Sequence, residues 1–216
     1  RRQSSQLKFS KTINCPAPLG AGCVLTCNRS WRVVETFKNT LNLSDEPINR
    51  KKAAVNLTQA FKPLQSDAAT MGVNLTDKQC QMLLRYAELL LLWNKKFNLT
   101  AITEPHEVYT KHVLDCLSVL PKLGSGSLID VGTGAGLPGL IIAIAEPDRE
   151  ILLLDKNAKR IRFLLQCISE FKLTQVRAEH NRIEDVSERF DIVTSRAFTS
   201  LVGFCELCQG VLSDTG

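Results

Sequence analysis

Hydrophobic and polar positions alternate along residues 75–216 in segments of two lengths, and this pattern predicts both helices and strands. Apolar residues recur three or four positions apart over 157–172, which predicts an amphipathic helix. Short, nearly continuous apolar runs are typical of buried parallel strands, and we expect strands at 128–131, 150–155, 174–178 and 190–194. Strands that alternate with helices predict an α/β fold with a parallel, doubly wound sheet, in which ligands bind at the carboxyl edge.

Two further helices are predicted ahead of the first strand. Thr76 and Gln79 fit a capping box, and a helix of about six turns follows on the apolar positions Leu83, Ala87, Leu90, Trp93 and Phe97. The next helix starts at Thr103 or the following residue, tolerates Pro105 in its first turn and runs to about Leu120. We therefore expect a helical cap over 67–123.

The N-terminal part has a different composition. Residues 1–34 contain no Asp or Glu and six Lys or Arg among many hydroxyl residues, which is typical of an organelle transit peptide. We expect a plastid location ahead of a mitochondrial one; the alternatives are a disordered tail or a wrongly placed gene start, with a cytoplasmic location if the source is bacterial. Residues 35–66 are interpreted as a linker with at most one short helix.

Charge is divided unevenly between the two parts. Residues 1–66 hold 11 Lys and Arg against 3 Asp and Glu, whereas residues 67–216 hold 16 against 19. The net charge of +5 is therefore poor support for nucleic-acid binding by the folded part. No apolar run is long enough to span a membrane, so we expect no membrane partner.

Eight cysteines are scattered over a chain too long to need disulfides, which favours a reducing compartment. Cys205 and Cys208 form a lone C-x-x-C in an apolar segment that is typical of a helix. Packed thiols are favoured over a metal or redox site because no second pair lies near them in sequence. We expect no metal.

A glycine-rich stretch carries the chemistry of the chain. Asp130 lies in the 128–131 strand, and Gly132, Gly134, Gly136 and Gly139 follow it before the chain turns apolar again. A strand, a glycine turn and a helix start in this order build a cofactor cradle, because the backbone can approach a ligand closely. The domain that contains it is expected to span 124–216.

Two cofactors fit this stretch. An acid at the strand end suits the cationic sulfonium of S-adenosyl-L-methionine (SAM), so Asp130, Gly132, Gly134 and Gly136 favour SAM. The spacing Gly134-x-Gly136-x-x-Gly139 also matches the dinucleotide fingerprint, and a purely structural turn is the third interpretation. In either cofactor site, Asp155, 19 residues after Gly136, would bind the ribose hydroxyls.

The motifs IDVGTGAGLPG, LLDKNAKRIRFL, RIED and SRAFTSL, preceded by LLLLWNKKFNLTAIT and KHVLDCL, resemble those of the RsmG/GidB family. The resemblance covers about residues 75–216. It implies a Rossmann-like SAM-dependent methyltransferase that modifies N7 of a guanine in 16S-type rRNA. It also implies further strands beyond the end of the chain, so we expect a truncated sheet in which the 190–194 strand has an unpaired edge.

The resemblance also implies roles for single residues. Gly132 and Leu137 would contact SAM, Ile183 and Glu184 would flank the adenine, and Arg196 would close the cofactor site and face the substrate. A core position is the alternative for Ile183, and a solvated surface position is the alternative for Glu184 and Arg196.

Residues on the substrate side are weaker candidates. Lys111, His112 and Asp115 share one helical face, and Lys111 stands where the family usually has Arg, which removes a bidentate fork. For His112, a core or capping role is an equal alternative to an RNA contact. Phe198 is a candidate for stacking on a splayed base.

Guanine N7 carries a lone pair and no proton, so methyl transfer to it needs no general base. The expected partner is small-subunit rRNA or an assembling 30S-type subunit, and we expect a monomer. A non-catalytic RNA- or ribosome-binding fragment and a nucleotide-dependent oxidoreductase are the alternative functions.

Overall fold

The computed structural model describes residues 24–27, 61–196 and 201–213, and within these ranges all four predicted strands are present. They pair in parallel in the order β5-β2-β3-β4. Their bounds are β2 (Leu128–Val131), β3 (Ile151–Asp155), β4 (Val176–His180) and β5 (Ile192–Arg196). The order reverses between β2 and β5, so a topological switch point of a Rossmann-like sheet lies between them.

A fifth strand corrects the prediction of an unpaired edge. β1 (Val24–Cys27) pairs antiparallel with β5, so that Val24 lies opposite Arg196 and Cys27 opposite Val193. The 190–194 strand is therefore covered on that side. β1 belongs to the 1–34 segment, and the other predictions for that segment concern residues outside the described ranges. A single four-residue strand whose residues pair with partners 166 to 172 positions away has no local signal by which it could be recognised.

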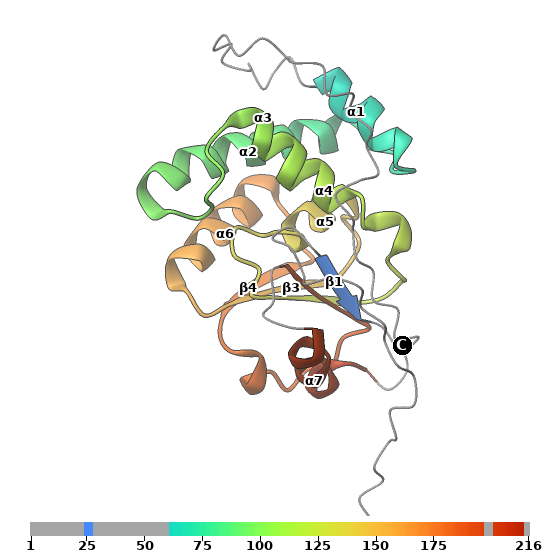
Figure 1. The fold of residues 1–216 in the computed structure, drawn as a ribbon, viewed down its shortest axis with the longest axis vertical. Helices are drawn as coiled ribbons and strands as arrows, with labels where there is room; N and C mark the ends of the chain where they lie inside the picture. The colour runs from blue at the N-terminus through green and yellow to red at the C-terminus, as the bar shows by residue number, and fades with distance from the viewer. Residues whose placement is uncertain (1–23, 28–60, 197–200, 214–216) are drawn as a thin grey trace, which may run out of the picture.

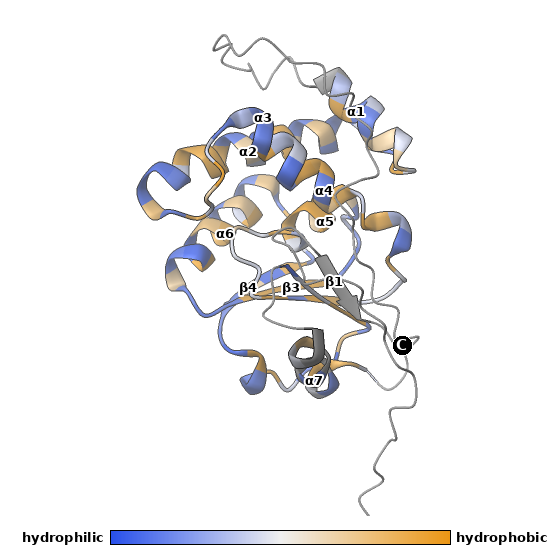
Figure 2. Ribbon diagram, viewed as in Figure 1, coloured by the Kyte–Doolittle hydropathy of each residue, from blue (hydrophilic) through white to orange (hydrophobic). Residues whose placement is uncertain are grey.

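Helices cover both faces of the sheet (Figure 1). α2 (Asp77–Phe97), α5 (Gly139–Ala145) and α6 (Ala158–Phe171) lie on one face, where their apolar side chains form the larger core with Leu128 and Leu153. α7 (Leu201–Val211) lies on the opposite face together with the short 3₁₀ helix η4 (Ile183–Asp185), and both pack on Ile129 and Leu152. In α2, α5 and α6, orange apolar segments face the sheet (Figure 2). The doubly wound α/β fold is confirmed.

Helices fill the region before the parallel strands, and the first of them starts ahead of residue 67. α1 (Phe61–Thr70) begins inside the 35–66 linker and crosses the expected boundary at residue 67. The capping box of α2 is present, since Thr76 accepts from the Gln79 N–H and Gln79 accepts from the Thr76 N–H. The second predicted helix is divided into α3 (Pro105–Val108), a π-helical turn η2 (Tyr109–Leu114) and α4 (Asp115–Leu117), followed by the 3₁₀ turn η3 (Leu120–Lys122).

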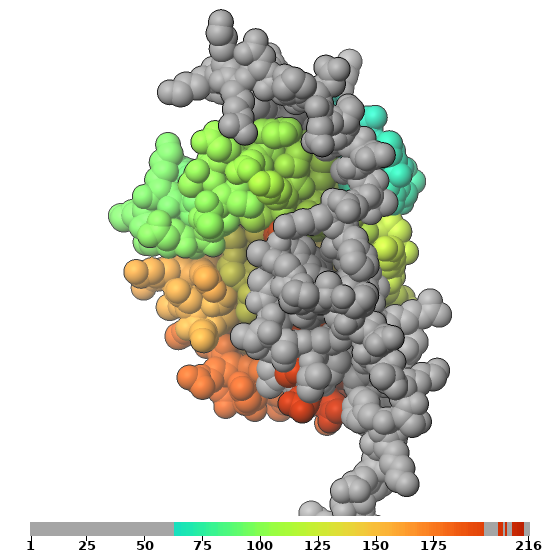
Figure 3. Space-filling model, viewed as in Figure 1, coloured from blue at the N-terminus to red at the C-terminus, as the bar shows by residue number. Residues whose placement is uncertain are grey.

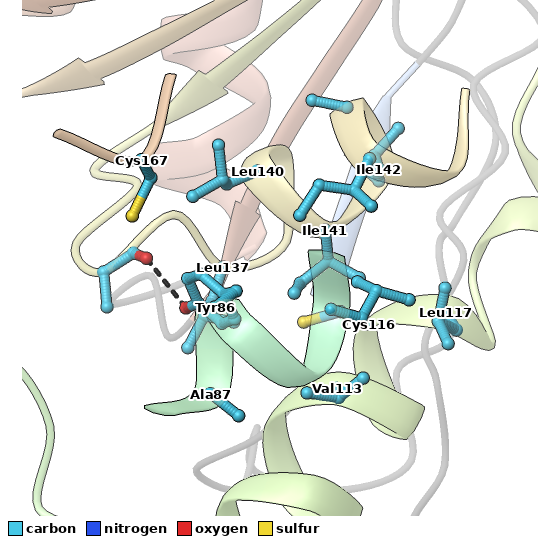
Figure 4. Close-up of a cluster of buried hydrophobic side chains, with 14 of the residues drawn as sticks. Tyr86, Ala87, Val113, Cys116, Leu117, Leu137, Leu140, Ile141, Ile142 and Cys167 are labelled. Carbon is cyan, nitrogen blue, oxygen red and sulfur yellow. Dashed lines mark hydrogen bonds between the residues drawn. The ribbon is translucent and has the colours of Figure 1, made fainter. Parts of the chain in front are cut away.

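The cap and the sheet share one core, and a polar contact inside it reaches the glycine stretch. The buried Tyr86 of α2 donates its hydroxyl to the carbonyl oxygen of Ala135 over 2.8 Å (Figure 4). Gln79 donates to the last carbonyl of α5, at Ala145, over 2.8 Å. Because both bonds join segments distant in sequence, the cap holds the cofactor cradle in place.

The cysteines that can be described behave as apolar side chains. Cys80, Cys116 and Cys167 are buried free thiols, and burial raises the pKa of Cys116 and of Cys167 to about 12. Cys205 and Cys208 lie on α7, but their side chains lie outside the described set. Among the residues described, no group of His, Cys, Asp and Glu could hold a metal ion, and no helix is long and apolar enough to cross a membrane.

Candidate functional site

The glycine loop after β2 has an open part and a packed part. Gly132 and Gly134 have left-handed φ angles of 68° and 61°, which L residues with side chains rarely adopt. A Cβ atom built on Gly132 would meet nothing within 4 Å, and one on Gly134 would only meet a backbone oxygen at 3.9 Å. These two positions therefore offer bare backbone to a ligand.

The other two glycines are needed for packing. A Cβ atom at Gly136 would lie 2.6 Å from Cβ of Leu140, and one at Gly139 would lie 2.7 Å from the Asp130 carboxylate and against Leu153. Contacts this short do not occur in folded proteins, so these glycines let α5 start directly against the sheet. The predicted glycine contacts with a cofactor thus rest on Gly132 and Gly134 more than on Gly136.

Asp130 is fully buried beneath the loop. Its Oδ2 accepts from the Thr133 hydroxyl over 2.6 Å and from the Gly139 N–H over 2.9 Å. Its Oδ1 accepts from the Thr194 hydroxyl over 3.1 Å. Burial raises the pKa of Asp130 to about 6 in spite of these hydrogen bonds. In the structure this carboxylate shapes the loop; its predicted attraction for a sulfonium would act through the loop and stays a prediction.

Asp155 lies at the carboxyl end of the neighbouring strand and faces the open part of the loop. Its Oδ2 accepts from the Gly134 N–H over 2.9 Å and forms an ion pair with Arg160 over 3.2 Å. Its Oδ1 accepts from the Asn157 N–H over 2.8 Å, where α6 begins. The carboxylate thus lies beside Gly134 and helps to hold the loop, and its contact with ribose hydroxyls stays a prediction.

Arg196 ends β5 and is held by the cap. One of its terminal nitrogens, Nη2, donates to the carbonyl oxygen of Lys111 over 2.7 Å and forms an ion pair with Asp115 over 3.0 Å. The other, Nη1, lies 3.0 Å from His112 Nδ1. The side chains of His112 and Asp115 therefore meet at Arg196, whereas Lys111 contributes only its backbone carbonyl and its side chain does not share that face.

The π-helical turn explains why the backbone carbonyl of Lys111 is available to accept a hydrogen bond from Arg196. The Asp115 N–H donates to the carbonyl oxygens of Thr110 and His112, and not to that of Lys111. In a regular α-helix the Lys111 carbonyl would accept this N–H. The π turn frees it to accept from Arg196, which is a common use of such turns at functional sites.

His112 is a buried partner of Arg196. His112 Nδ1 lies 3.0 Å from Arg196 Nη1 and 3.1 Å from the Lys111 carbonyl oxygen, and Nε2 lies 2.8 Å from the Thr100 hydroxyl. Because a guanidinium can only donate, the contact with Arg196 requires an unprotonated Nδ1, and in that tautomer Nε2–H donates to Thr100. Burial and, next, the charge of Arg196 lower the pKa of His112 to about 4. With 6% of its surface exposed and both nitrogens engaged, the imidazole fits the core alternative, and an RNA contact stays a prediction.

The remaining predicted residues are spread around this edge. Leu137 is buried in the loop, Ile183 is buried in η4, and Glu184 beside it is exposed. The Lys111 side chain points outwards and forms an ion pair with Glu107 over 2.5 Å. Phe198 lies outside the described residues.

Sequence reasoning missed three supports of the loop: Thr133, Thr194 and Tyr86. For Thr133, a hydroxyl three residues after an acid was an available signal.

A pocket elsewhere does not coincide with this site. A cavity of about 610 Å³ lies at the opposite, amino edge of the sheet, and none of the predicted site residues lines it. Its walls are Ser125–Ser127 and Glu146–Glu150. Arg149 fills part of this edge and donates to the carbonyl oxygens of Gly124 and Gly126. The chemistry that the sequence predicts belongs to the carboxyl edge.

Known proteins match the part of the chain that contains this edge of the sheet. Residues 79–216 match the model of the GidB family, described as rRNA small subunit methyltransferase G. Ribosomal RNA small subunit methyltransferase G of Psychrobacter arcticus is 45% identical over 175 residues, which cover 81% of this chain and 74% of that protein. The protein of the same name from Acinetobacter baumannii is 46% identical over 159 residues, 71% of this chain and 76% of that protein.

Among solved structures, the chain is similar to coclaurine N-methyltransferase bound to N-methylheliamine and SAH. The TM-score is 0.35 at 15% identity, over 63% of this chain and 48% of that chain, which is too distant to carry an argument.

Proposed function

This chain belongs to the GidB family of rRNA small subunit methyltransferase G, and we propose that it methylates N7 of a guanine in small-subunit rRNA with SAM as the methyl donor. The observation that carries the proposal is the pairing of that family match with an open glycine loop at the switch point of the sheet. Backbone at Gly132 and Gly134 is free of side chains where the loop faces outwards.

The residues at this edge fit SAM. Gly132 and Gly134 would take the methionine part against bare backbone, and Asp155 would accept from the ribose hydroxyls. Ile183 and Glu184 would flank the adenine from η4. The buried Asp130 carboxylate adds negative potential beneath the loop, which favours a cationic ligand over a pyrophosphate.

When bound, SAM supplies an electrophilic methyl group on a sulfonium. The protein has to place guanine N7 in line with that group and to exclude water, and it needs no proton acceptor because N7 carries a lone pair. Arg196 is the residue we assign to substrate positioning, since its guanidinium is fixed by Lys111 and Asp115 at the edge of the site. A fixed guanidinium plane can stack on or bond to a splayed base without loss of side-chain entropy.

The test uses the purified chain, titrated calorimetrically with SAM and with NAD, and assayed for methyl transfer to small-subunit rRNA. We expect SAM binding, no NAD binding and methylation at a guanine N7. SAM binding without any methyl transfer to rRNA would favour the non-catalytic alternative, and NAD binding in place of SAM would favour the oxidoreductase.

Two variants locate the site. Arg196→Ala should abolish methylation while the fold is retained, because the residue is assigned to close the cofactor site and to face the substrate. Asp155→Ala should weaken SAM binding about tenfold or more, because a buried ribose contact is lost. Wild-type turnover in the first variant, or unchanged SAM affinity in the second, would remove that residue from the site.

The acid-free N-terminal composition supports an organelle, with a plastid in first place, as the location. The full chain with a C-terminal fluorescent protein should then enter plastids in plant cells. Uniform cytosolic fluorescence would contradict this assignment without affecting the proposed reaction.

A further inference from the structure

Helices α2 and α6 lie side by side and run in opposite directions. Arg85, early in α2, forms an ion pair over 2.7 Å with Glu170, late in α6. Trp93, near the end of α2, packs against Phe163 of α6 with 5.6 Å between ring centroids. The end of α2 and the start of α6 are therefore neighbours, and both lie on the left side of the molecule (Figures 1 and 3).

The two ends of this helix pair differ in charge. At one end Arg85 is neutralised by Glu88 and Glu170. At the other end, which we call the basic end, five cationic side chains are exposed and form no ion pair with any described residue: Lys95, Lys96, Lys156, Lys159 and Arg162. No Asp or Glu occurs in 89–103 or in 156–169.

This concentration of positive charge contrasts with the charge balance of residues 67–216 as a whole. Residues 67–216 hold 16 Lys and Arg against 19 Asp and Glu, so an average surface there is slightly acidic. An ordinary solvated helix face mixes the two signs, as the Arg85 end does, because like charges repel. Five cations without an acid cost stability unless a polyanion neutralises them.

The basic end adjoins the candidate site through both helices. From the start of α6, Arg160 reaches Asp155, which binds the glycine loop at Gly134. From the end of α2, Asn94 accepts from the Thr100 N–H over 2.9 Å, and the Thr100 hydroxyl contacts His112, the partner of Arg196. A polyanion on this surface would therefore lie next to the place where the methyl group is transferred.

Apolar and aromatic groups are interleaved with these cations. Leu92 has 61% of its surface exposed, and Lys96 lies over the half-buried ring of Phe97 at 5.7 Å from its centroid. Cations that alternate with apolar and aromatic side chains suit a nucleic acid, which presents phosphates and base faces together.

We propose that the basic end is the surface on which the phosphate backbone of the rRNA flanking the target guanine docks, an assignment that rests on the proposed function. Each phosphate that a cation neutralises releases counterions, so the logarithm of the binding constant falls with the logarithm of salt by about 0.7 to 0.9 per contact. The cations of the basic end must then appear in the salt dependence of rRNA binding.

The experiment compares two triple variants of the full chain. The first, Lys95→Gln with Lys159→Gln and Arg162→Gln, neutralises the basic end but keeps Lys96 on its aromatic ring. The control, Lys78→Gln with Lys122→Gln and Lys172→Gln, removes the same charge from exposed sites. Lys78 and Lys172 lie at the far ends of the same two helices.

Binding of small-subunit rRNA is measured from 50 to 300 mM KCl, with SAM affinity and thermal unfolding recorded for each protein. We expect the first variant to lose about 2 units of salt slope and tenfold or more in affinity at low salt, with SAM affinity unchanged. The control should keep the wild-type slope to within about half a unit.

Equal losses in both variants would mean that net charge alone matters, and an unchanged slope in the first variant would mean that RNA docks elsewhere; either result overturns this assignment. If the wild-type chain methylates rRNA, such a result leaves the proposed function intact. If the wild-type chain neither binds nor methylates rRNA, the proposed function fails first.

Discussion

Two aspartates hold the two edges of the sheet with nearly the same set of hydrogen bonds. At the carboxyl edge, Asp130 accepts one backbone N–H and two hydroxyl groups. At the amino edge, Asp191 accepts the N–H and hydroxyl of Ser127 and the hydroxyl of Ser213, at 2.8 to 3.0 Å. Their pKa values nevertheless move in opposite directions, to about 6 for Asp130 and below the usual range for Asp191.

Burial explains the difference. Asp130 has no exposed surface, so the loss of water outweighs its hydrogen bonds and disfavours the charge. Asp191 is only half-buried, and the hydrogen bond from the Ser127 backbone, with that from Ser213, stabilises its charged form. The carboxylate that is costlier to ionise lies beneath the open glycines Gly132 and Gly134, at the edge that we assign to the cofactor, and Asp191 lies at the opposite edge.

The largest effect is expected from Gly139→Ala. The new methyl group would press on Leu153 and on the Asp130 carboxylate inside the core, so unfolding free energy should fall by about 3 kcal/mol or more. Gly210→Ala is the control, because a Cβ there meets nothing within 4 Å and alanine favours the helix. Chemical denaturation measures both, and equal stability of the two variants would contradict the packing argument.

Asp191→Ala should lower the unfolding free energy by roughly 3 kcal/mol, because donors from Ser127 and Ser213 lose their acceptor. Since this edge is assigned a structural role only, SAM affinity of the folded variant should stay within twofold of wild type in calorimetry. A large loss of SAM affinity would show that the two edges are not independent.

Asp130→Asn should change the pH dependence of stability. The pKa of Asp130 in the folded protein is raised to about 6. Between about pH 4 and 6 the folded state therefore binds more protons than the unfolded state. The contribution of this group to wild-type stability falls as pH rises through that range. As pH rises from about 4 to 6, the unfolding free energy of the wild type should fall relative to that of the variant by on the order of 2 kcal/mol.

SAM binding provides the second measurement on Asp130→Asn. An asparagine can keep the acceptor for Thr133 and Gly139, so the loop should be retained. A loss of SAM affinity with the loop intact would then report the missing negative charge. Unchanged SAM affinity would limit Asp130 to shaping the loop.

The smallest effect on stability is expected from Gly132→Ala. The site has space for a methyl group, and only the left-handed φ of 68° is strained, at a cost of about 1 kcal/mol. SAM affinity should fall much more than this, because the methyl group occupies the face offered to the ligand. A loss of stability without a loss of binding would place the ligand elsewhere.

Local pattern was sufficient for much of the fold and for the position of the site. The four parallel strands, the capping box at Thr76 and the long helix after it follow from interactions within a few residues. The glycine loop was recognisable because left-handed turns restrict residue choice. Arg196 was placed at the site by family resemblance, and the structure adds the partners that hold it.

Contacts between distant segments were not predictable in this way. β1 pairs with β5 across the edge that was expected to be open, and Tyr86 reaches Ala135 from the cap. The π turn that frees the Lys111 carbonyl also leaves no clear pattern in the apolar spacing, because one extra residue in a helix turn only shifts the phase by part of a turn.

The amino-acid sequence determines which segments are strands and helices, where the backbone must be glycine, and which acids and cations follow the strands, since these depend on neighbours in the chain. Tertiary structure decides which of those groups lose water and which meet. Asp130 and Asp191 are the same residue type with similar donors, yet the depth of burial sets opposite pKa shifts. Desolvation and long-range pairing depend on the whole fold, so only the assembled molecule sets these two aspartates apart.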